Sequence, residues 1–418
     1  MRRLLMVAFH YPPYEGGSGV HRTLKFSKYL PDNGWQPIIL SAHPRAYPKI
    51  GERQIQEIPR EAIVKRAFAL DTARHLSIRG AYLRMMALPD PWITWWIGAV
   101  WCGLRLIRRY RPEIIWSTYP IATAHLIAFT LHRMTGIPWV ADFRDSMTED
   151  NYPPDPWSRR CYRLIEKKVV TNAARVVFTT ESTRQMYVER YPALSADRCI
   201  VIPNGYDEED YAGLSSLSKS DAVNGRPVRL VHAGVIYPEE RDPRSFFRAL
   251  RRLKAEGKVS AGTLRVDLRA SGNEECYGAL LSAMGIADIV RLLPALSHRE
   301  AIQDCAAADG LLVLQAASCN HQIPAKVYEY LRLGRPILGL TPEGGDTALL
   351  LKLLGGATII DLADEESLYR LIPGFLSSVR SGRHPLPDRR KVNCYSREYQ
   401  TSQVARCLAE LAPSKKRD

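Results

Sequence analysis

Residues 310–338 give the clearest indication of the fold, and they include Gly310-Leu-Leu-Val-Leu314, Ser318-Cys-Asn-His-Gln-Ile-Pro-Ala-Lys-Val-Tyr-Glu-Tyr-Leu331 and Gly334-Arg-Pro-Ile-Leu338. An apolar run of strand length ends at Leu314 and enters a polar loop. Pro324 then stands where the first turn of a helix favours proline, and a second apolar run follows Gly334. This succession indicates two parallel strands joined by a crossover helix.

Short β-branched runs alternate with helical patterns along the whole chain. In the first half we expect strands at Leu4–Ala8, Pro37–Ser41, Ile114–Thr118, Pro138–Asp142, Arg175–Thr180 and Ile200–Pro203. In the second half we expect them at Val228–Ala233, Leu264–Ala270, Ile289–Leu293, Gly310–Leu314, Pro336–Leu340 and Thr358–Asp361. One open sheet of about twelve strands would be unusually large, so the sequence predicts an α/β protein with two doubly wound domains. We place the boundary between the turn Asn204-Gly205 and the Ser/Gly/Asn-rich stretch Gly213–Arg226.

The charge of the chain is strongly uneven. Its 418 residues carry 58 Lys or Arg and 44 Asp or Glu, a formal net charge of +14. Residues 1–200 hold 29 basic and 17 acidic side chains, so the rest of the chain is nearly balanced. Such an asymmetry indicates a partner of opposite charge, which could be nucleic acid, an anionic membrane surface or a phosphorylated substrate. With 46% apolar residues, the chain is neither disordered nor a small disulfide scaffold.

Cysteine usage and hydropathy predict a cytoplasmic protein. The eight cysteines are scattered, with no C-x-x-C pair and no zinc-finger spacing, which is typical of reduced thiols. The apolar run at the start stops at His10, too early for a secretory leader, so we interpret it as the first strand. The uncharged runs Pro91–Leu104 and Ile114–His132 do not qualify as membrane spans, the first because it is short and the second because it contains polar side chains.

Two clusters in the first half follow expected strands. The glycine loop Gly16-Gly-Ser-Gly19 opens onto an amphipathic helix, whose first-turn N–H groups would suit a phosphate. A glycine turn without a ligand explains the same residues. The second cluster, Asp142-Phe-Arg-Asp145, ends a buried strand, where ligands sit in open α/β sheets. A local salt-bridge or helix-capping cluster is the alternative there.

A third cluster, in the second half, combines opposite charges. Lys326 and Glu329 stand three residues apart on one face at the start of the helix that follows Pro324. A cation and a carboxylate directed at a cleft would suit a diphosphate and a ribose diol. An ion pair on a solvated helix face is the alternative interpretation.

Five motifs follow one another along the chain: His10-Tyr-Pro-Pro with Gly16-Gly-Ser-Gly-Val20, Ala141-Asp-Phe-Arg-Asp145, Val201-Ile-Pro-Asn-Gly-Tyr206, His232-Ala-Gly-Val-Ile-Tyr237 and Ile323-Pro-Ala-Lys-Val-Tyr-Glu-Tyr330. In this order they resemble the family-4 glycosyltransferases, which are retaining enzymes of the two-domain GT-B fold. The resemblance spans nearly the whole chain. It implies a Rossmann-like acceptor-binding domain at 1–205, a Rossmann-like nucleotide-sugar-binding domain at 206–394 facing it across a cleft, and a segment 395–418 that comprises a helix crossing back to the first domain and a basic tail.

The resemblance also implies roles for individual residues. Glu329 matches the second carboxylate of the family's E-x7-E motif, which binds the ribose, whereas His321 stands in place of the first. Val235 replaces the family's arginine after Gly234, and Arg241 lies near the family's lysine position. The expected donor-binding residues are Gly234, Tyr237, Arg241, His321, Lys326 and Glu329. The expected catalytic residues are Arg241, Lys326 and Asp142, with Asp142 positioning the acceptor. The expected acceptor or phosphate contacts are Gly16, Gly17, Ser18, Gly19, Arg144 and Asp145.

The implied reaction is of the hexosyltransferase type, with transfer from a UDP- or GDP-sugar and retention of the anomeric configuration. Fixed cations would stabilise the departing nucleoside diphosphate. The family resembled is generally metal-independent, so we expect neither a metal nor a cofactor besides the donor co-substrate. A nucleotide-sugar epimerase or hydrolase of the same fold is one alternative function, and a basic nucleic-acid-binding protein is another.

In this scheme the basic half of the chain meets the acceptor. We therefore expect an anionic or lipid-linked acceptor, as used in cell-surface polysaccharide biosynthesis, and no nucleic acid partner. The segment Trp92–Arg111 would place Trp101, Arg105, Arg108 and Arg109 on one helical stripe, a combination that suits bilayer headgroups. Peripheral contact with the inner membrane face is one interpretation. Core tryptophans beside solvated arginines are the other.

Overall fold

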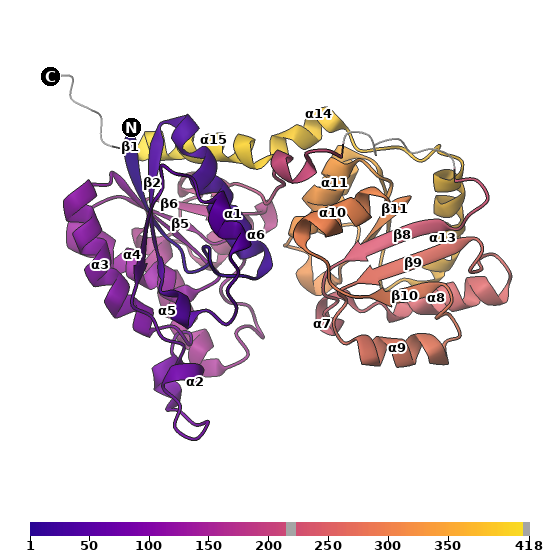
Figure 1. Ribbon diagram of the computed structural model, residues 1–418, viewed down its shortest axis with the longest axis horizontal. Coiled ribbons are helices and arrows are strands. Elements are labelled where there is room, and N and C mark those ends of the chain that lie inside the picture. The colour runs from indigo at the N-terminus through magenta and orange to yellow at the C-terminus, as the bar shows by residue number, and fades with distance from the viewer. Residues whose placement is uncertain (215–222, 413–418) are drawn as a thin grey trace. The chain divides into compact units, whose positions relative to one another are not determined.

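The chain forms two compact units in the computed structural model, which describes residues 1–214 and 223–412 (Figure 1). The first unit comprises Met1–Pro203 together with the C-terminal segment that begins at Arg397, and the second comprises Asn204–Ser396. Each unit is built on its own parallel sheet. The basic tail and part of the Ser/Gly/Asn-rich stretch lie outside the described residues.

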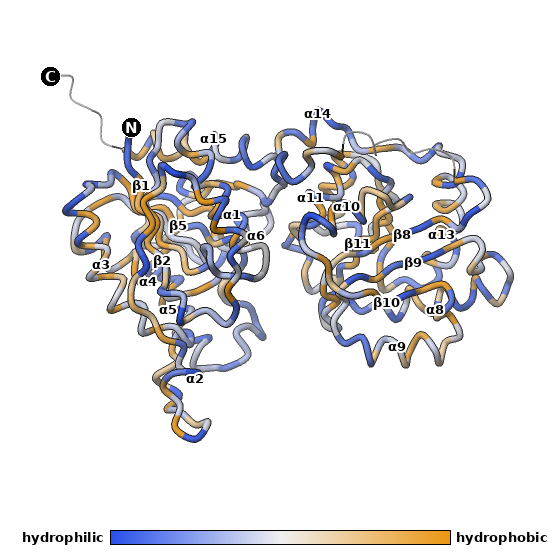
Figure 2. Tube along the Cα trace, in the orientation of Figure 1, coloured by the Kyte–Doolittle hydropathy of each residue, from blue (hydrophilic) through white to orange (hydrophobic). Residues whose placement is uncertain are grey.

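The first sheet has seven strands in the order β3-β2-β1-β4-β5-β6-β7. The strands are β1 (Arg2–Val7), β2 (Trp35–Ala42), β3 (Ile63–Ala67), β4 (Ile114–Thr118), β5 (Trp139–Asp142), β6 (Arg175–Phe178) and β7 (Cys199–Val201). Most of their residues are apolar because helices cover both faces of the sheet, and much of β1, β2 and β5 accordingly appears orange in Figure 2. The strand order reverses between β1 and β4, so a ligand is expected at the carboxyl ends of these two strands.

Strand β3 is the one strand of this sheet that the sequence pattern missed. It lies at the sheet edge and pairs with β2 in parallel register, with Leu40 opposite Lys65 and Ser41 opposite Arg66. Two consecutive charged residues in a run of five hide the usual signal of a buried strand. An edge strand tolerates them because one side of it is unpaired.

Helices cover the two faces of the first sheet as separate layers. On one face lie α3 (Thr94–Tyr110), α4 (Ala122–Thr135) and α5 (Pro156–Asn172), packed side by side over one apolar core. On the other face lies α1 (Gly17–Tyr29). The shorter helices of the unit are α2 (Thr72–His75) and α6 (Glu181–Arg190).

The C-terminal helix α15 (Arg397–Leu411) belongs to the first unit, as the sequence predicts. It packs beside α1, and its buried Val404 and Leu408 join Leu4 and Leu24 in one core cluster (Figure 1). A segment almost two hundred residues after β7 thereby completes the apolar layer of this sheet face.

The second sheet has six strands in the order β10-β9-β8-β11-β12-β13. The strands are β8 (Val228–Ala233), β9 (Leu264–Arg269), β10 (Val290–Leu293), β11 (Gly310–Leu314), β12 (Ile337–Leu340) and β13 (Ala357–Ile360). The helices are α7 (Pro238–Arg241), α8 (Arg244–Ala255), α9 (Glu274–Ala283), α10 (His298–Ala306), α11 (Ala325–Leu333), α12 (Asp346–Leu354), α13 (Glu365–Arg380) and α14 (Arg389–Val392). Two apolar clusters fill the two sides of the sheet, and the strand order reverses between β8 and β11.

The local signals around α11 act as expected. Pro324 is the residue immediately before the helix, where its missing N–H costs nothing, and Gly334 ends the helix with a left-handed φ of 68°. The helix therefore starts close to the end of β11 and directs its first turn towards that end of the sheet.

Among the described residues, no helix is long and apolar enough to cross a membrane. All eight cysteines lie within the described residues, and none of them forms a disulfide bond.

Candidate active site

Lys326 and Gly234 meet at the carboxyl ends of β8 and β11, the two neighbouring strands where the second sheet reverses its order. Gly234 directly follows β8 and has a φ of +120°, a conformation that side chains rarely adopt. A Cβ atom on Gly234 would lie 2.7 Å from Lys326 Nζ. Glycine at this position thus makes room for the lysine, which projects from the first turn of α11.

His232, the next-to-last residue of β8, fixes the Lys326 side chain. It is 1% exposed, and its Nδ1 lies 2.9 Å from the carbonyl oxygen of Leu312. A carbonyl accepts hydrogen bonds, so Nδ1 carries the proton and Nε2 is left as an acceptor. Lys326 Nζ lies 3.1 Å from Nε2 and donates to it.

The electrostatics of this pair favour an incoming anion. Burial, together with the charge of Lys326, lowers the pKa of His232 well below its ordinary value, so the imidazole is neutral. Burial and the nearby Arg241 lower the pKa of Lys326 to about 7. A negative charge placed here would relieve the repulsion between the two cations.

Arg241 completes the cationic part of the site. Its Nη1 donates to the Val235 carbonyl at 2.8 Å, and its guanidinium lies 5.5 Å from the centre of the Tyr237 ring. Its Nη2 is 3.9 Å from Glu240, at the limit of an ion pair. The loop after β8 therefore brings Gly234 and Arg241 beside Lys326, with Tyr237 next to Arg241, and the roles of these residues in donor binding stay predictions.

Glu329 lies one turn after Lys326 on α11, half-buried and facing α10. Its Oε1 is 3.0 Å from Nε2 of His298, the first residue of α10. His321 lies in the same β11–α11 connection, half-buried, with its Nε2 3.4 Å from the Gln322 side-chain nitrogen. Glu329 and His321 thus lie at the same end of the sheet as the two cations. Their expected contacts with a donor stay predictions.

A second polar cluster lies at the carboxyl ends of β1 and β4 in the first unit. A Cβ atom on Gly19, in the first turn of α1, would lie 2.7 Å from His10 Nδ1 and 3.0 Å from Arg144 Nη1. Arg144 Nη1 also donates to the Tyr119 carbonyl at 3.2 Å. The His10 ring stacks on Tyr14 with ring centres 4.3 Å apart. The glycine loop therefore opens onto a helix N-terminus that a cation and a histidine border.

Arg144 combines a strained backbone conformation with a buried side chain. Its φ is 61°, a left-handed conformation that costs a non-glycine residue about 1–3 kcal/mol. Arg144 is 5% exposed, and within the described residues its Nε and the Nδ1 of His10 are buried without a hydrogen-bond partner. Burial lowers the pKa of His10 to about 3 and raises the pKa of Asp145, which is half-buried beside Arg144. Backbone strain together with buried polar atoms that make no hydrogen bond is typical of a ligand site.

Asp142 occupies a different setting from the one expected for an acceptor contact. It is 1% exposed, and both of its oxygens accept from Arg22, each at 3.0 Å. Thr118 Oγ1 donates to it at 3.1 Å, and Arg22 also donates to the carbonyls of Ile202 and Pro203. Through Arg22, the Asp142 carboxylate links α1 to β5 and to the last residues of the first unit. We therefore assign Asp142 a structural role, in which it positions these elements relative to one another.

The tryptophan segment at residues 92–111 divides between core and surface. Trp95 is fully buried, and Trp92 Nε1 donates to the Ala46 carbonyl at 3.1 Å. Trp101, in contrast, is 59% exposed, and the Arg105 guanidinium lies 3.2 Å from its ring centre. Arg108 and Arg109 are exposed as well. Trp92 and Trp95 therefore belong to the packed interior, whereas Trp101 and the arginines lie at the surface, where contact with a membrane stays a prediction.

Residues 17–205 match the model of the glycosyl transferase 4-like domain. No curated protein sequence matches the chain significantly. Among solved structures, sucrose-phosphate synthase from Thermosynechococcus elongatus superposes with a TM-score of 0.67 at 12% identity, over 98% of this chain and 99% of that one. HepE of Anabaena in complex with UDP and glucose gives 0.64 at 14% identity, over 98% and 100%. The lipopolysaccharide outer core galactosyltransferase WaaB gives 0.61 at 12% identity, also over 98% and 100%.

Residues 17–205 therefore form a glycosyl transferase 4-like domain, and the chain as a whole has the two-domain GT-B fold. Among residues 1–214 and 223–412, no three His, Cys, Asp or Glu side chains converge in a way that could hold a metal ion.

The sequence motifs predict roles for Lys326 and Arg241 but not for the residues that hold such side chains in place. His232 opens one of the five motifs, and a histidine directly after Leu230 and Val231 in β8 is the signal that could have identified it. Arg22 is hidden in an ordinary amphipathic helix pattern, because burial of its charge depends on Asp142, 120 residues away. His10 follows β1 and opens the first motif, but the resemblance implied no role for it.

Proposed function

We propose that this glycosyltransferase transfers a hexose from a UDP- or GDP-sugar to an anionic or lipid-linked acceptor, with retention of the anomeric configuration. The acceptor would belong to cell-surface polysaccharide biosynthesis, and the enzyme would act in the cytoplasm at the inner membrane face. The observation that carries the proposal is the pair of cations, Lys326 and Arg241, at the carboxyl ends of β8 and β11. Residues 206–394 would bind the donor, residues 1–205 the acceptor, and the helix of 395–418 would join the first domain.

Breaking the bond between sugar and phosphate develops negative charge on the departing nucleoside diphosphate. Lys326 and Arg241 would stabilise that charge, and Gly234 would let the phosphates approach the β8 loop closely. Glu329 would accept hydrogen bonds from the ribose, with Tyr237 and His321 lining the same site. A donor phosphate oxygen would take the proton of the acceptor hydroxyl on the face from which the diphosphate leaves, so the step requires no protein base.

The acceptor would meet the first unit at the glycine loop. Arg144 Nε is a buried donor that has no partner among the described residues, Arg144 lies close to Gly19 in the first turn of α1, and Asp145 follows it. The acceptor would contact the loop of Gly16, Gly17, Ser18 and Gly19 there. Anions suit a helix N-terminus bordered by a guanidinium, because both contribute positive charge. An acceptor with a phosphate or carboxylate group would therefore be preferred over its neutral analogue. Contact of residues 92–111 with the membrane would bring the enzyme to a lipid-linked acceptor.

The test is turnover with a panel of UDP-, GDP- and dTDP-sugars, with a membrane lipid extract as the source of acceptor and NMR assignment of the anomeric configuration in donor and product. We expect one nucleotide class to support transfer with retention, and Glu329→Ala to weaken donor binding while Glu343→Ala, an exposed carboxylate of the same unit, does not. Inversion, or turnover that is unaffected by Glu329→Ala, would contradict the proposal. Release of an epimer or free sugar without acceptor would favour the epimerase or hydrolase alternative.

A further inference from the structure

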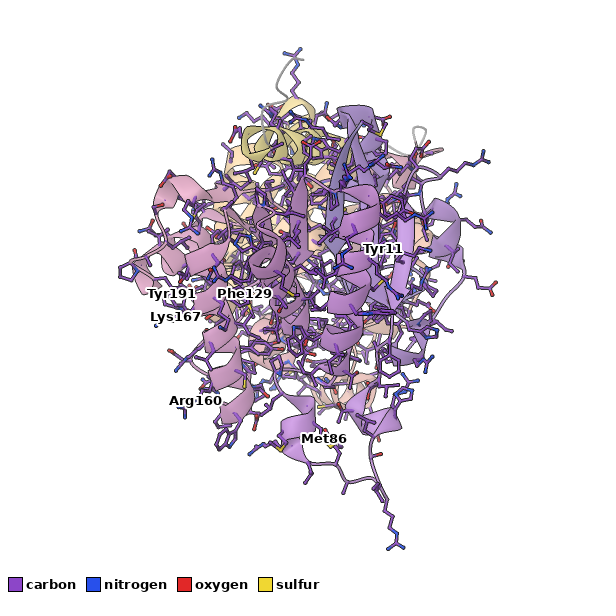
Figure 3. All side chains as sticks on the ribbon, turned by 90° about the vertical axis from the view of Figure 1, so that its left-hand side faces the viewer. Tyr11, Met86, Phe129, Arg160, Lys167 and Tyr191 are labelled. Atoms are coloured by element: carbon purple, nitrogen blue, oxygen red, sulfur yellow. The ribbon has the colours of Figure 1, made fainter. Side chains whose placement is uncertain are left out.

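Three adjacent helices of the first unit, α3, α4 and α5, carry a nearly uniform positive charge. All three lie within the described residues. They hold nine basic residues, which are Arg105, Arg108, Arg109, Arg133, Arg159, Arg160, Arg163, Lys167 and Lys168, and a single acidic residue, Glu166. We call the solvent-facing surface of these helices the basic face. Figure 3 shows Arg160 and Lys167 of α5 at the outer edge of the unit.

The one acidic side chain does not reach this surface. Glu166 has no exposed area and accepts hydrogen bonds from Thr148 Oγ1 at 2.6 Å and Tyr191 Oη at 2.7 Å, and a third from Tyr187. Its charge is therefore satisfied inside the unit. Surfaces that face only water usually intersperse both signs, so an unbalanced face of this size indicates an anionic partner.

Large apolar side chains are exposed on the same face. Ile97 and Trp101 lie one turn apart on α3, and Trp157 and Leu164 lie two turns apart on α5; each is more than half exposed. A single exposed apolar side chain needs no explanation, but several on adjoining helices among basic residues mark an interaction surface.

Next to this face, residues 76–88, which we call the hairpin, comprise a tight turn at Arg79-Gly80 and the 3-10 helix Arg84–Ala87 and expose several apolar side chains. Ile78 and Ala81 exchange both backbone hydrogen bonds, at 2.8 and 3.1 Å, around Arg79 and Gly80. Both turn residues have positive φ, 52° and 80°, as a two-residue type I′ turn requires. The hairpin also carries Leu83 and Met85 into solvent, and Met85 is 73% exposed. In Figure 1 the segment after α2 projects away from the body of the first unit.

The base of the hairpin is fixed to both flanking helices. Thr72 Oγ1 donates to the Met86 and Pro91 carbonyls at 2.8 and 2.9 Å. Arg84 pairs with Asp155, the residue that caps α5. On the other side, the Leu70 N–H donates to Thr94 Oγ1 at the start of α3, at 2.8 Å. The exposed apolar side chains of the hairpin are thus held in place beside the basic face by hydrogen bonds and an ion pair.

We propose that the hairpin of residues 76–88 inserts its apolar side chains into an anionic lipid bilayer while the basic face lies on the headgroups. The proposal rests on the peripheral membrane contact proposed above and adds a second element, the hairpin, as its anchor. A bilayer is the partner that matches both features, since it offers anionic headgroups beside an apolar layer, and arginine and tryptophan are suited to the boundary between them. A nucleic acid would use the charge but leave Ile78, Leu83 and Met85 without a partner.

The test is flotation of the full-length enzyme with vesicles of phosphatidylcholine alone or mixed with phosphatidylglycerol, at low and high salt. Wild-type enzyme should bind the mixed vesicles at low salt and ignore phosphatidylcholine. Leu83→Ser/Met85→Ser should lower binding by at least about tenfold, because two apolar side chains lose their burial in lipid. Arg160→Glu/Lys167→Glu should lower it as well and reduce its salt dependence. The matched control is Leu349→Ser/Leu353→Ser, which removes two exposed leucines of α12 in the other unit and should change nothing.

The outcomes separate this inference from the contact proposed for residues 92–111. If Arg105→Glu/Arg109→Glu abolishes binding while Leu83→Ser/Met85→Ser keeps it, the contact through α3 stands and the hairpin anchor is wrong. If wild-type enzyme binds neither vesicle, both are wrong, whereas donor binding by the second unit is unaffected. Quenching of tryptophan fluorescence by brominated lipid, present in wild-type enzyme and lost in the hairpin variant, would support insertion.

Discussion

At the scale of single residues, Lys326 shows how the fold prepares a site for an anion. The lysine is held by a neutral His232, faces a second cation, and has a pKa lowered to about 7 by burial and Arg241. An isolated cation in such surroundings is unfavourable, and a bound diphosphate would supply the missing negative charge. The repulsion between the two cations and the burial of the lysine charge therefore favour an anionic ligand over a neutral one.

This arrangement predicts a pH dependence of nucleotide binding. Below pH 7 the ammonium form of Lys326 dominates, and above it the amine form does. A diphosphate favours the ammonium form, so binding raises the pKa of Lys326 and takes up a proton. The affinity for the nucleoside diphosphate should therefore fall as the pH rises above 7, by at most about tenfold per pH unit. Calorimetric titration in two buffers of different ionisation enthalpy measures the proton uptake directly.

The control is Lys326→Arg, since arginine stays charged over this whole pH range. The variant should bind without proton uptake above pH 7. A wild-type affinity that is constant between pH 7 and 9, or equal proton uptake by the arginine variant, would show that Lys326 does not titrate on binding.

A second prediction at this scale concerns Asp142 and Arg22. Removing one partner of a buried ion pair leaves an uncompensated charge, so Asp142→Asn should lower the free energy of unfolding by about 3–5 kcal/mol, as measured by chemical denaturation. The exposed pair of Lys49 and Glu15, 2.9 Å apart, provides the comparison, and Glu15→Gln should cost about 0–1 kcal/mol. Full stability of Asp142→Asn together with loss of activity would instead favour the acceptor contact predicted from the sequence.

At the scale of elements, short apolar runs were sufficient to predict twelve of the thirteen strands that the described part of the chain forms, because strands buried on both faces are continuously apolar. The edge strand β3 was missed because its charges are exposed on one side. The hairpin of residues 76–88 was missed for a related reason, since its apolar residues follow neither strand nor helix periodicity. Its distinctive property is the exposure of its apolar side chains to solvent, and a sequence pattern does not show which apolar side chains are exposed.

For helix α15, the sequence pattern predicts the helix itself but not the elements against which it packs. Its helical spacing was visible in the sequence, but its place beside α1 was implied by the family resemblance alone. If α15 is integral to the first unit, Leu408→Ala should lower the free energy of unfolding by about 2–5 kcal/mol, because Leu408 is fully buried in a core that β1 and α1 share. Chemical denaturation with Glu410→Ala as the exposed control on the same helix measures the difference. Equal stability of both variants would mean that α15 lies on the surface of the unit without supporting it.

At the scale of the whole molecule, the sequence shows that the excess of positive charge lies in the first half of the chain. It does not show which surface of the folded protein carries that charge. The fold gathers nine basic residues onto one face of the first sheet and turns the accompanying Glu166 inward. The sequence could not predict this distribution, because α3, α4 and α5 become neighbours only once the sheet has formed. The donor-side cations, in contrast, stand close to a strand end and a helix start within two of the quoted motifs, so the resemblance was enough to name them.

Nucleotide binding by the second unit tests the central claim most directly. We would titrate UDP, GDP and dTDP into wild-type enzyme and into Lys326→Ala, with Lys352→Ala, an exposed lysine of the same unit, as the matched control. The account predicts that one of these diphosphates binds wild-type and Lys352→Ala equally, and that Lys326→Ala binds it at least about tenfold more weakly. Binding that is unchanged by Lys326→Ala, or no binding of any of the three, would contradict it.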